Sequence, residues 1–363
     1  MINFLGFAIL LGCLMFSQQT YSQKPPQFLN IAYYVGNDTL IDKFELQKLT
    51  HIIYSFGHLK ANEFYLGHKK DTLTLFKLSQ LKKSFPNLKI LVSLGGWGGC
   101  KTCSDIFSTE TDRQKFALSV KNCLDYFNID GIDLDWEYPG LPSLPEHGFK
   151  AEDKQNFTKL VEALRQTLGA KKEISFAVGG FKKAIDSSIE LDKVMPLVDR
   201  IHIMSYDLYD MKKTGLHTSL HSKPQQQNLS ADYMVQYLIK NKVPKHKIII
   251  GAAFYGRLWR GVPNINNGLY QSGLNEFGYA YKDVDKLMPI DSGYIRYYDD
   301  SAQLAYTYNP HKKIFMSFDN IRSVKAKTNY VKKLGLGGIM FWELTCDKFT
   351  NGLVNAIYEE LQN

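Results

Sequence analysis

The chain has 363 residues, of which 44% are hydrophobic and 22% charged. This composition excludes an intrinsically disordered protein, and the length suffices for one large core or two smaller ones. The formal net charge is +8, but the lysines and arginines are scattered, so no basic patch of the kind that binds nucleic acid is present and no nucleic-acid partner is expected.

The first 22 residues have the pattern of a secretory signal peptide. An apolar run from Phe4 to Phe16 precedes a polar stretch that ends at Ser22, and this run is shorter than the roughly 20 residues that a bilayer span needs. Cleavage would leave a secreted or periplasmic protein that begins at Gln23, with no stable membrane span. Lipid attachment at Cys13 is the alternative, although apolar residues follow where a polar tether is expected.

Short apolar runs rich in β-branched residues alternate with longer amphipathic stretches, which is typical of parallel strands connected by helices. Eight runs are predicted to be strands: 29–35, 51–56, 89–93, 131–137, 174–178, 200–206, 247–255 and 337–342. Helices are predicted over 73–83, 111–127, 152–168, 190–197, 231–241 and 324–334.

Eight strand–helix units predict an α/β fold, a closed (β/α)₈ TIM barrel, in which the loops after the strands meet on one face. An open doubly wound sheet is the alternative, but no glycine-rich phosphate turn follows the first strand. The interval before the eighth strand is too long for a structureless loop and predicts a small α+β insertion between strands seven and eight. The predicted domains are a signal peptide over 1–22, a catalytic barrel over 23–260 and 314–363, and an insertion over 261–313.

Four cysteines follow the predicted signal peptide, which is too few for a disulfide scaffold in a chain of this length. Cys100 and Cys103 lie in one predicted loop, where export would allow them to form a disulfide. Cys123 is predicted to be a free buried thiol. No second cysteine or histidine pair follows at a spacing that suits zinc, so neither a metal nor a cofactor is predicted.

The fourth predicted strand carries the densest chemistry, with the sequence DGIDLDWEYP over 130–139. Side chains alternate along a strand, so Asp133, Asp135 and Glu137 share one face. Three ionised carboxylates in a barrel interior repel one another, and at least one proton is expected to be shared. Because Glu137 falls at the carboxyl end of the strand, where barrel enzymes react, general acid catalysis is the favoured interpretation, and binding of Mg²⁺ or Ca²⁺ is the alternative.

This strand resembles the DxxDxDxE signature of glycoside hydrolase family 18, the chitinases and their relatives. Four more segments resemble motifs of that family in the same order: SLGGW at 93–97, MSYD at 204–207, FYGR at 254–257 and GGIMFW at 337–342. The resemblance covers essentially the whole chain from about residue 29 onward. It implies a chitinase that hydrolyses β-1,4 bonds between N-acetylglucosamine units, with chitin or its oligosaccharides as the partner. The protein is expected to be a monomer and, from the signal-peptide pattern, to be secreted or periplasmic.

The resemblance also implies roles for the residues. Glu137 is expected to act as general acid and then general base, while the acetamido oxygen of the substrate attacks in a retaining reaction. Asp135 is expected to hold the acetamido group, Asp133 to share a proton with Asp135, and Tyr206 to donate to the acetamido oxygen. Trp342 is expected to form the floor under the sugar, and Trp97 to stack on the leaving-group side. The other predicted substrate-binding residues are Asp207, Tyr255, Arg257, Met204, Tyr34 and Phe56.

Two departures from the family pattern affect the expected substrate. Segments 36–38 and 208–212 lack the groove-lining tryptophans that are common in relatives, which favours short or soluble oligosaccharides over crystalline chitin.

An endo-β-N-acetylglucosaminidase that acts on N-glycans is an alternative function. A non-catalytic chitin-binding lectin of the same fold is another, although such proteins arise when the acid is replaced, and Glu137 is present.

Overall fold

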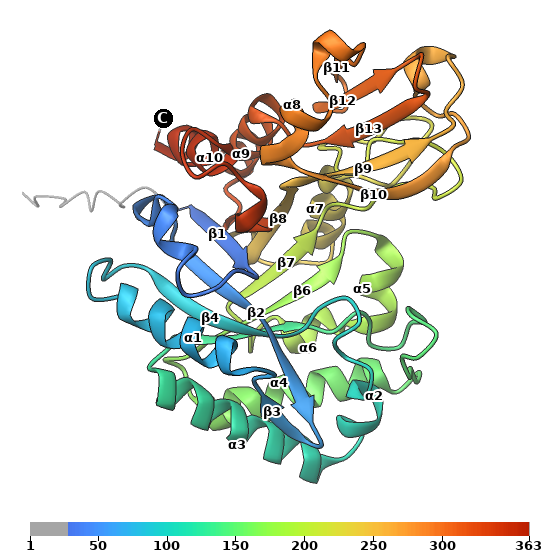
Figure 1. The fold of residues 1–363 in the computed structure, drawn as a ribbon. Coiled ribbons are helices and arrows are strands. Elements are labelled where there is room, and N and C mark those ends of the chain that lie inside the picture. Colours follow the sequence, from blue (N-terminus) through green and yellow to red (C-terminus); the bar gives the residue numbers. More distant parts are fainter. Residues whose placement is uncertain (1–27, 363) are drawn as a thin grey trace, which may run out of the picture.

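Eight parallel strands form a closed barrel within residues 28–362, the part of the chain that the computed structural model describes (Figure 1). The barrel closes because the first strand pairs with both the second and the last. Its strands are β1 (Leu29–Tyr34), β2 (His51–Lys60), β4 (Lys89–Gly95), β5 (Gly131–Asp135), β6 (Glu173–Gly179), β7 (Arg200–Met204), β8 (Ile248–Ala253) and β14 (Gly338–Trp342). The predicted TIM barrel is confirmed, while the predicted signal peptide lies outside the described residues.

Helices connect these strands around the outside of the barrel (Figure 1). They are α1 (Lys69–Leu81), α2 (Cys103–Ile106), α3 (Glu110–Phe127), α4 (Asp153–Leu168), α5 (Lys182–Ser188), α6 (Leu191–Val194), α7 (Ala231–Lys240), α9 (Ile321–Leu334) and α10 (Leu353–Gln362). Local sequence sets the ends of α9: Asn320 and Ser323 form a reciprocal capping box at its start, and Gly335 takes a left-handed conformation at its end. Within residues 28–362, no helix is long and apolar enough to cross a membrane.

A five-stranded antiparallel sheet is inserted between β8 and β14, in the predicted place, and it projects from one side of the barrel (Figure 1). Its strands in spatial order are β10 (Leu274–Ala280), β9 (Tyr255–Arg260), β13 (Ile314–Phe318), β12 (Leu304–Asn309) and β11 (Ile295–Asp299). The short helix α8 (Val284–Leu287) lies within this insertion, and the short strand β3 (Glu63–Tyr65) extends β2 as a hairpin. Two of these strands lie just outside the predicted insertion of residues 261–313. They are β9 before it and β13 after it, and they pair directly with each other.

Apolar side chains form four clusters in the fold. The largest core lies between the barrel strands and the surrounding helices, and a smaller one fills the barrel interior around Tyr33, Met204 and Met340. The two faces of the inserted sheet are covered by separate clusters around Trp259 and Met316.

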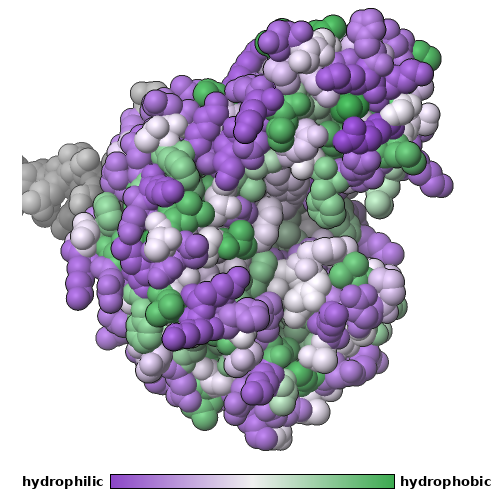
Figure 2. All heavy atoms as spheres, in the orientation of Figure 1, coloured by the Kyte–Doolittle hydropathy of each residue, from purple (hydrophilic) through white to green (hydrophobic). Residues whose placement is uncertain are grey.

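The space-filling view shows a hollow between the projecting insertion and the barrel below it (Figure 2). The insertion therefore forms a raised side wall beside the barrel.

Candidate active site

Three acidic side chains meet inside the barrel at the end of β5. Asp133 and Asp135 belong to the strand, Glu137 follows two residues beyond it, and all three are at least 90% buried. The residues of opposite parity pack into the core outside the barrel: Ile132, Leu134 and Trp136. The predicted alternation of this segment is therefore confirmed.

Asp133 is the deepest of the three acids and lies within hydrogen-bond range of three hydroxyl groups. Ser93 on β4 and Ser175 on β6 are in register with it, and their hydroxyls donate to it at 2.8 and 2.7 Å. The Tyr33 hydroxyl lies 3.0 Å from Asp133 Oδ2 and 2.9 Å from Nδ1 of His202. Burial raises the pKa of the Asp133 carboxyl although these hydrogen bonds lower it, and burial keeps the pKa of His202 well below its usual value. The imidazole is therefore neutral near pH 7.

Glu137 and Asp135 both hold protons more strongly than ordinary carboxylic acids. Burial raises the pKa of Glu137 to about 7, with a further increase from the negative charge of Asp207 and an opposing hydrogen bond from Tyr138. Burial raises the pKa of Asp135 well above its usual value, and the charges of Glu137 and Asp133 add to this effect. Oδ1 of Asp135 is buried without a hydrogen-bond partner among residues 28–362, so it can accept a donor from a ligand.

Tyr206 presents a hydroxyl group to the same interior. It follows β7 directly, and the nearest partner of its hydroxyl is the sulfur of Met340 at 3.9 Å, a weak acceptor. Burial raises the pKa of Tyr206 well above its usual value, and the charge of Asp135 adds to this effect. The phenol therefore stays protonated and can donate to a stronger acceptor.

Asp207 forms an ion pair that links the barrel to the insertion. Arg257 on β9 donates from Nε to Oδ1 at 2.5 Å and from a second nitrogen to Oδ2, and Nδ1 of His217 lies 3.4 Å from Oδ1. Partial desolvation would raise the pKa of Asp207, whose side chain is 37% exposed, but the hydrogen bonds from Arg257 and His217 hold it well below its usual range. Asp207 therefore remains ionised beside two acids whose pKa values are raised.

Aromatic rings line the rest of the site. Trp342 ends β14 and stacks on Phe56 with ring centres 5.5 Å apart, while Tyr255 contacts Tyr206 edge-on at 6.0 Å. Trp97 lies in the loop after β4 and is 59% exposed. Gly96 in this loop has φ of 76°, and a Cβ there would come within 2.3 Å of the Phe56 ring, so the turn needs glycine. The Trp97 ring is therefore accessible to solvent at this end of the barrel.

Tyr34 is the one predicted binding residue that the structure places elsewhere. It is fully buried in the core outside the barrel, and its hydroxyl donates to the carbonyl oxygen of Asn37 at 2.5 Å. The prediction that it contacts substrate is wrong because strand alternation turns Tyr34 outward and Tyr33 inward. Met204, by contrast, lies in the interior cluster with Tyr206 and Trp342.

Several residues of the site were missed from the sequence. Asp133 is surrounded by four of them, Tyr33, Ser93, Ser175 and His202. Each is a polar side chain at an inward position of a buried strand, and this pattern could have indicated a place in the site. His217 lies in a loop and gave no such signal. Cys100 in the Trp97 loop and Cys103 at the start of α2 form a disulfide, while Cys123 is a free, half-buried thiol. Within residues 28–362, no group of three or more histidine, cysteine or acidic side chains is arranged to hold a metal ion.

A parallel barrel that buries an acid of raised pKa at a strand end, beside two aspartates, a tyrosine and a stacked tryptophan, suits the proton transfer and sugar binding of a glycoside hydrolase. Residues 20–347 match the family described as Glycosyl hydrolases family 18. The chain therefore belongs to glycoside hydrolase family 18.

Individual relatives agree with this placement. The chain is 36% identical over 296 residues to chitinase A1 of Niallia circulans, covering 75% of this chain and 42% of that protein. It is 29% identical over 325 residues to chitotriosidase-1 of Mus musculus, covering 84% and 68%. A family 18 N-acetylglucosaminidase from Paenibacillus barengoltzii superposes with a TM-score of 0.84 at 34% identity, covering 92% of this chain and 99% of that one. The chain thus spans less than half the length of chitinase A1.

Proposed function

We propose that this protein hydrolyses β-1,4 bonds between N-acetylglucosamine units, with Glu137 as general acid and base. The observation that carries the proposal is the burial of Glu137 in the barrel interior with Asp135 and Tyr206, which raises the pKa of Glu137 to about 7. Near neutral pH this carboxyl is poised to give a proton and to take one back. The relatives named chitinase, chitotriosidase and N-acetylglucosaminidase support the substrate class.

The first step breaks the bond between the sugar C1 and the glycosidic oxygen. Glu137 gives its proton to that oxygen, and the carbonyl oxygen of the substrate's acetamido group forms a bond to C1, which yields an oxazolinium ion. The unpartnered Oδ1 of Asp135 is suited to accept the acetamido N–H, and the Tyr206 hydroxyl to donate to the acetamido oxygen. Family 18 is an exception to hydrolysis by two carboxylates, because the substrate supplies its own nucleophile.

The second step returns the enzyme to its starting state. Ionised Glu137 takes a proton from water, the water oxygen bonds to C1, and the bond between C1 and the acetamido oxygen breaks. Two displacements at one carbon leave the product with retained β configuration. The ring of Trp342, with Phe56 behind it, offers an apolar face for the pyranose during both steps.

Short or soluble chito-oligosaccharides are the proposed substrates, because segments 36–38 and 208–212 lack tryptophan and leave few stacking surfaces. Secretion or periplasmic export is proposed from the pattern of residues 1–22. The disulfide between Cys100 and Cys103 supports an oxidising compartment.

The test uses Glu137→Gln, which keeps the shape of the side chain and removes the acid proton. Turnover of chito-oligosaccharides of increasing length should fall about 10²-fold or more while binding persists. Glu152→Gln, at an exposed glutamate, is the matched control. Cello-oligosaccharides, which lack the acetamido group, should not be cleaved, and release of glycan from a high-mannose glycoprotein would indicate the N-glycan activity instead. Unchanged turnover in Glu137→Gln would refute the proposal.

A further inference from the structure

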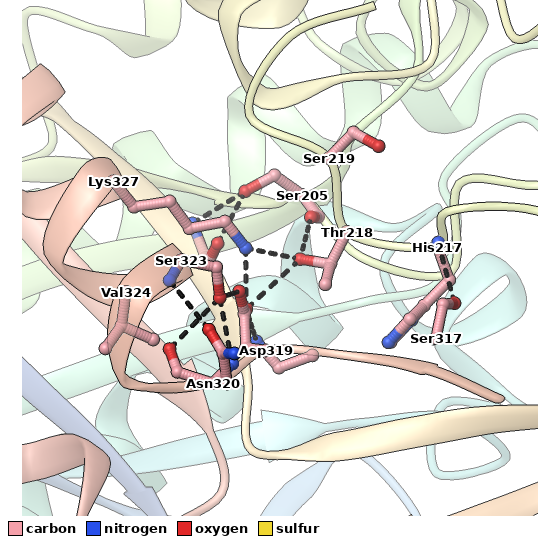
Figure 3. A network of polar contacts seen from close by, with 12 residues as sticks. Ser205, His217, Thr218, Ser219, Ser317, Asp319, Asn320, Ser323, Val324 and Lys327 are labelled. Atoms are coloured by element: carbon pink, nitrogen blue, oxygen red, sulfur yellow. Dashed lines mark hydrogen bonds and ion pairs between the residues drawn. The ribbon is translucent and has the colours of Figure 1, made fainter. Parts of the chain in front are cut away.

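A buried ion pair lies where the insertion rejoins the barrel (Figure 3). Lys327 on α9 and Asp319, just after β13, are both fully buried. The ammonium group of Lys327 donates to Oδ2 of Asp319 and to Oγ1 of Thr218, each at 2.6 Å. Ser323 donates to the other oxygen of Asp319 at 2.6 Å. Both charges are therefore paired and hydrogen-bonded inside the protein.

Thr218 connects this ion pair to the active-site end of β7. Its hydroxyl donates to the carbonyl oxygen of Ser205 at 2.8 Å. The hydroxyl of Ser205 in turn exchanges hydrogen bonds with the backbone of Gly251 on β8, at 2.8 and 2.9 Å. Asp319 also accepts from the backbone N–H of Ala253 at the end of β8, at 2.9 Å. One buried network thus holds the ends of β7 and β8 together.

The sheet itself does not hold the residues that follow β7. The pairing of β7 with β6 ends at Met204, and its pairing with β8 ends at Ile203. Tyr206 and Asp207 therefore lie beyond the ladder of backbone hydrogen bonds. His217, next to Thr218, donates its backbone N–H to Ser317 Oγ at 3.2 Å and places its ring beside Asp207. Thr218 thus bonds the carbonyl oxygen of the residue before Tyr206, and His217 lies against Asp207.

A purely stabilising role explains this arrangement poorly. Taking two charges out of water has a large desolvation cost, so a buried ion pair contributes little net stability compared with apolar residues of similar volume. Hydrogen bonds of fixed direction do, however, select one local conformation. The ion pair directs three such bonds toward Thr218, Ala253 and Ser323.

We propose that the ion pair between Lys327 and Asp319, acting through Thr218, is a positioning device that holds Tyr206 and Asp207 in reactive geometry. This inference rests on the proposed function, because a displaced Tyr206 would lower turnover. Thr218, Asp319 and Lys327 are positioning residues and do not touch substrate.

The test compares two buried threonines. Thr218→Val removes the hydroxyl that joins the ion pair to Ser205 and leaves the ion pair itself in place. Thr328→Val removes an equally buried hydroxyl whose only hydrogen bond within the described part of the chain is to the carbonyl oxygen of Val324 in its own helix, at 2.8 Å. Thr218→Val should lower kcat about tenfold or more with less than a threefold change in KM, because small misplacements of reacting groups cost about that much. Thr328→Val and Thr218→Ser should stay within about twofold of the wild type.

Amide hydrogen exchange over 205–207 gives a second measurement that does not depend on turnover. Exchange there should be faster in Thr218→Val than in the wild type and unchanged in Thr328→Val. Wild-type kcat together with wild-type exchange in Thr218→Val would overturn the inference, as would equal effects in both valine variants. If the wild type cleaves no chito-oligosaccharide, the proposed function fails, and the exchange comparison still tests the positioning. If Thr218→Val does not fold, Lys327→Met/Asp319→Asn replaces it with the same expected and refuting results.

Discussion

The raised pKa of Glu137 predicts how activity depends on pH. With the usual value of 4.5, only about 0.3% of this carboxyl would carry the acid proton at pH 7, whereas a pKa of about 7 leaves about half of it protonated. Burial therefore increases the reactive fraction about 150-fold. Above pH 7 the fraction falls about tenfold per pH unit, to about 1% at pH 9. We expect kcat/KM for a soluble chito-oligosaccharide to follow this decline, since it reports the free enzyme.

Asp207 allows the cause of this decline to be tested. Its negative charge raises the pKa of Glu137, so Asp207→Asn should move the decline to lower pH, and the unpaired Arg257 should move it in the same direction. Asp210→Asn, at an exposed position of the same loop, is the matched control and should leave the pH of the decline in place. A flat profile up to pH 9, or a decline at higher pH in Asp207→Asn, would refute the reasoning.

Two further predictions concern the aromatic floor and the disulfide. Trp342→Ala removes the ring that stacks on Phe56 and should lower kcat/KM about tenfold or more. Tyr126→Ala, at an exposed ring on α3, is the control and should leave kcat/KM unchanged. An equal effect of both variants would contradict the role of Trp342. The double variant Cys100→Ala/Cys103→Ala opens the four-residue loop that the disulfide closes. Closing a loop of this length stabilises the folded protein by about 2 kcal/mol in the chain-entropy model, so the variant should lower Tm by a few degrees in a calorimetric scan. Cys123→Ala, at the free thiol, is its control, and a wild-type Tm in the double variant would contradict the expectation.

The barrel was predictable because its determinants are local and periodic. Eight apolar runs separated by amphipathic stretches can bury both faces of a strand only in a parallel sheet covered by helices. The alternation along 131–137 likewise determined which side chains share a face, and this placed Asp133, Asp135 and Glu137 inside. The same rule was available for Tyr33 and Tyr34, and applying it there would have selected Tyr33.

Only the tertiary structure decided which partners these residues meet. Ser93 and Ser175 flank Asp133 because of the register between neighbouring strands, which depends on how the barrel closes. Burial inside that closed barrel, rather than the identity of the side chain, raises the pKa of Glu137 to about 7.

The buried network behind Tyr206 belongs to the same class of feature. Thr218, Asp319 and Lys327 are up to 109 residues apart in the chain, and no local pattern connects them. By itself the sequence determined the fold and the acidic strand, because these follow from the alternation of side chains along short segments. The protonation of the acids and the support of β7 were decided by the tertiary structure, because desolvation and hydrogen bonds between distant segments exist only once the barrel and its insertion have packed together.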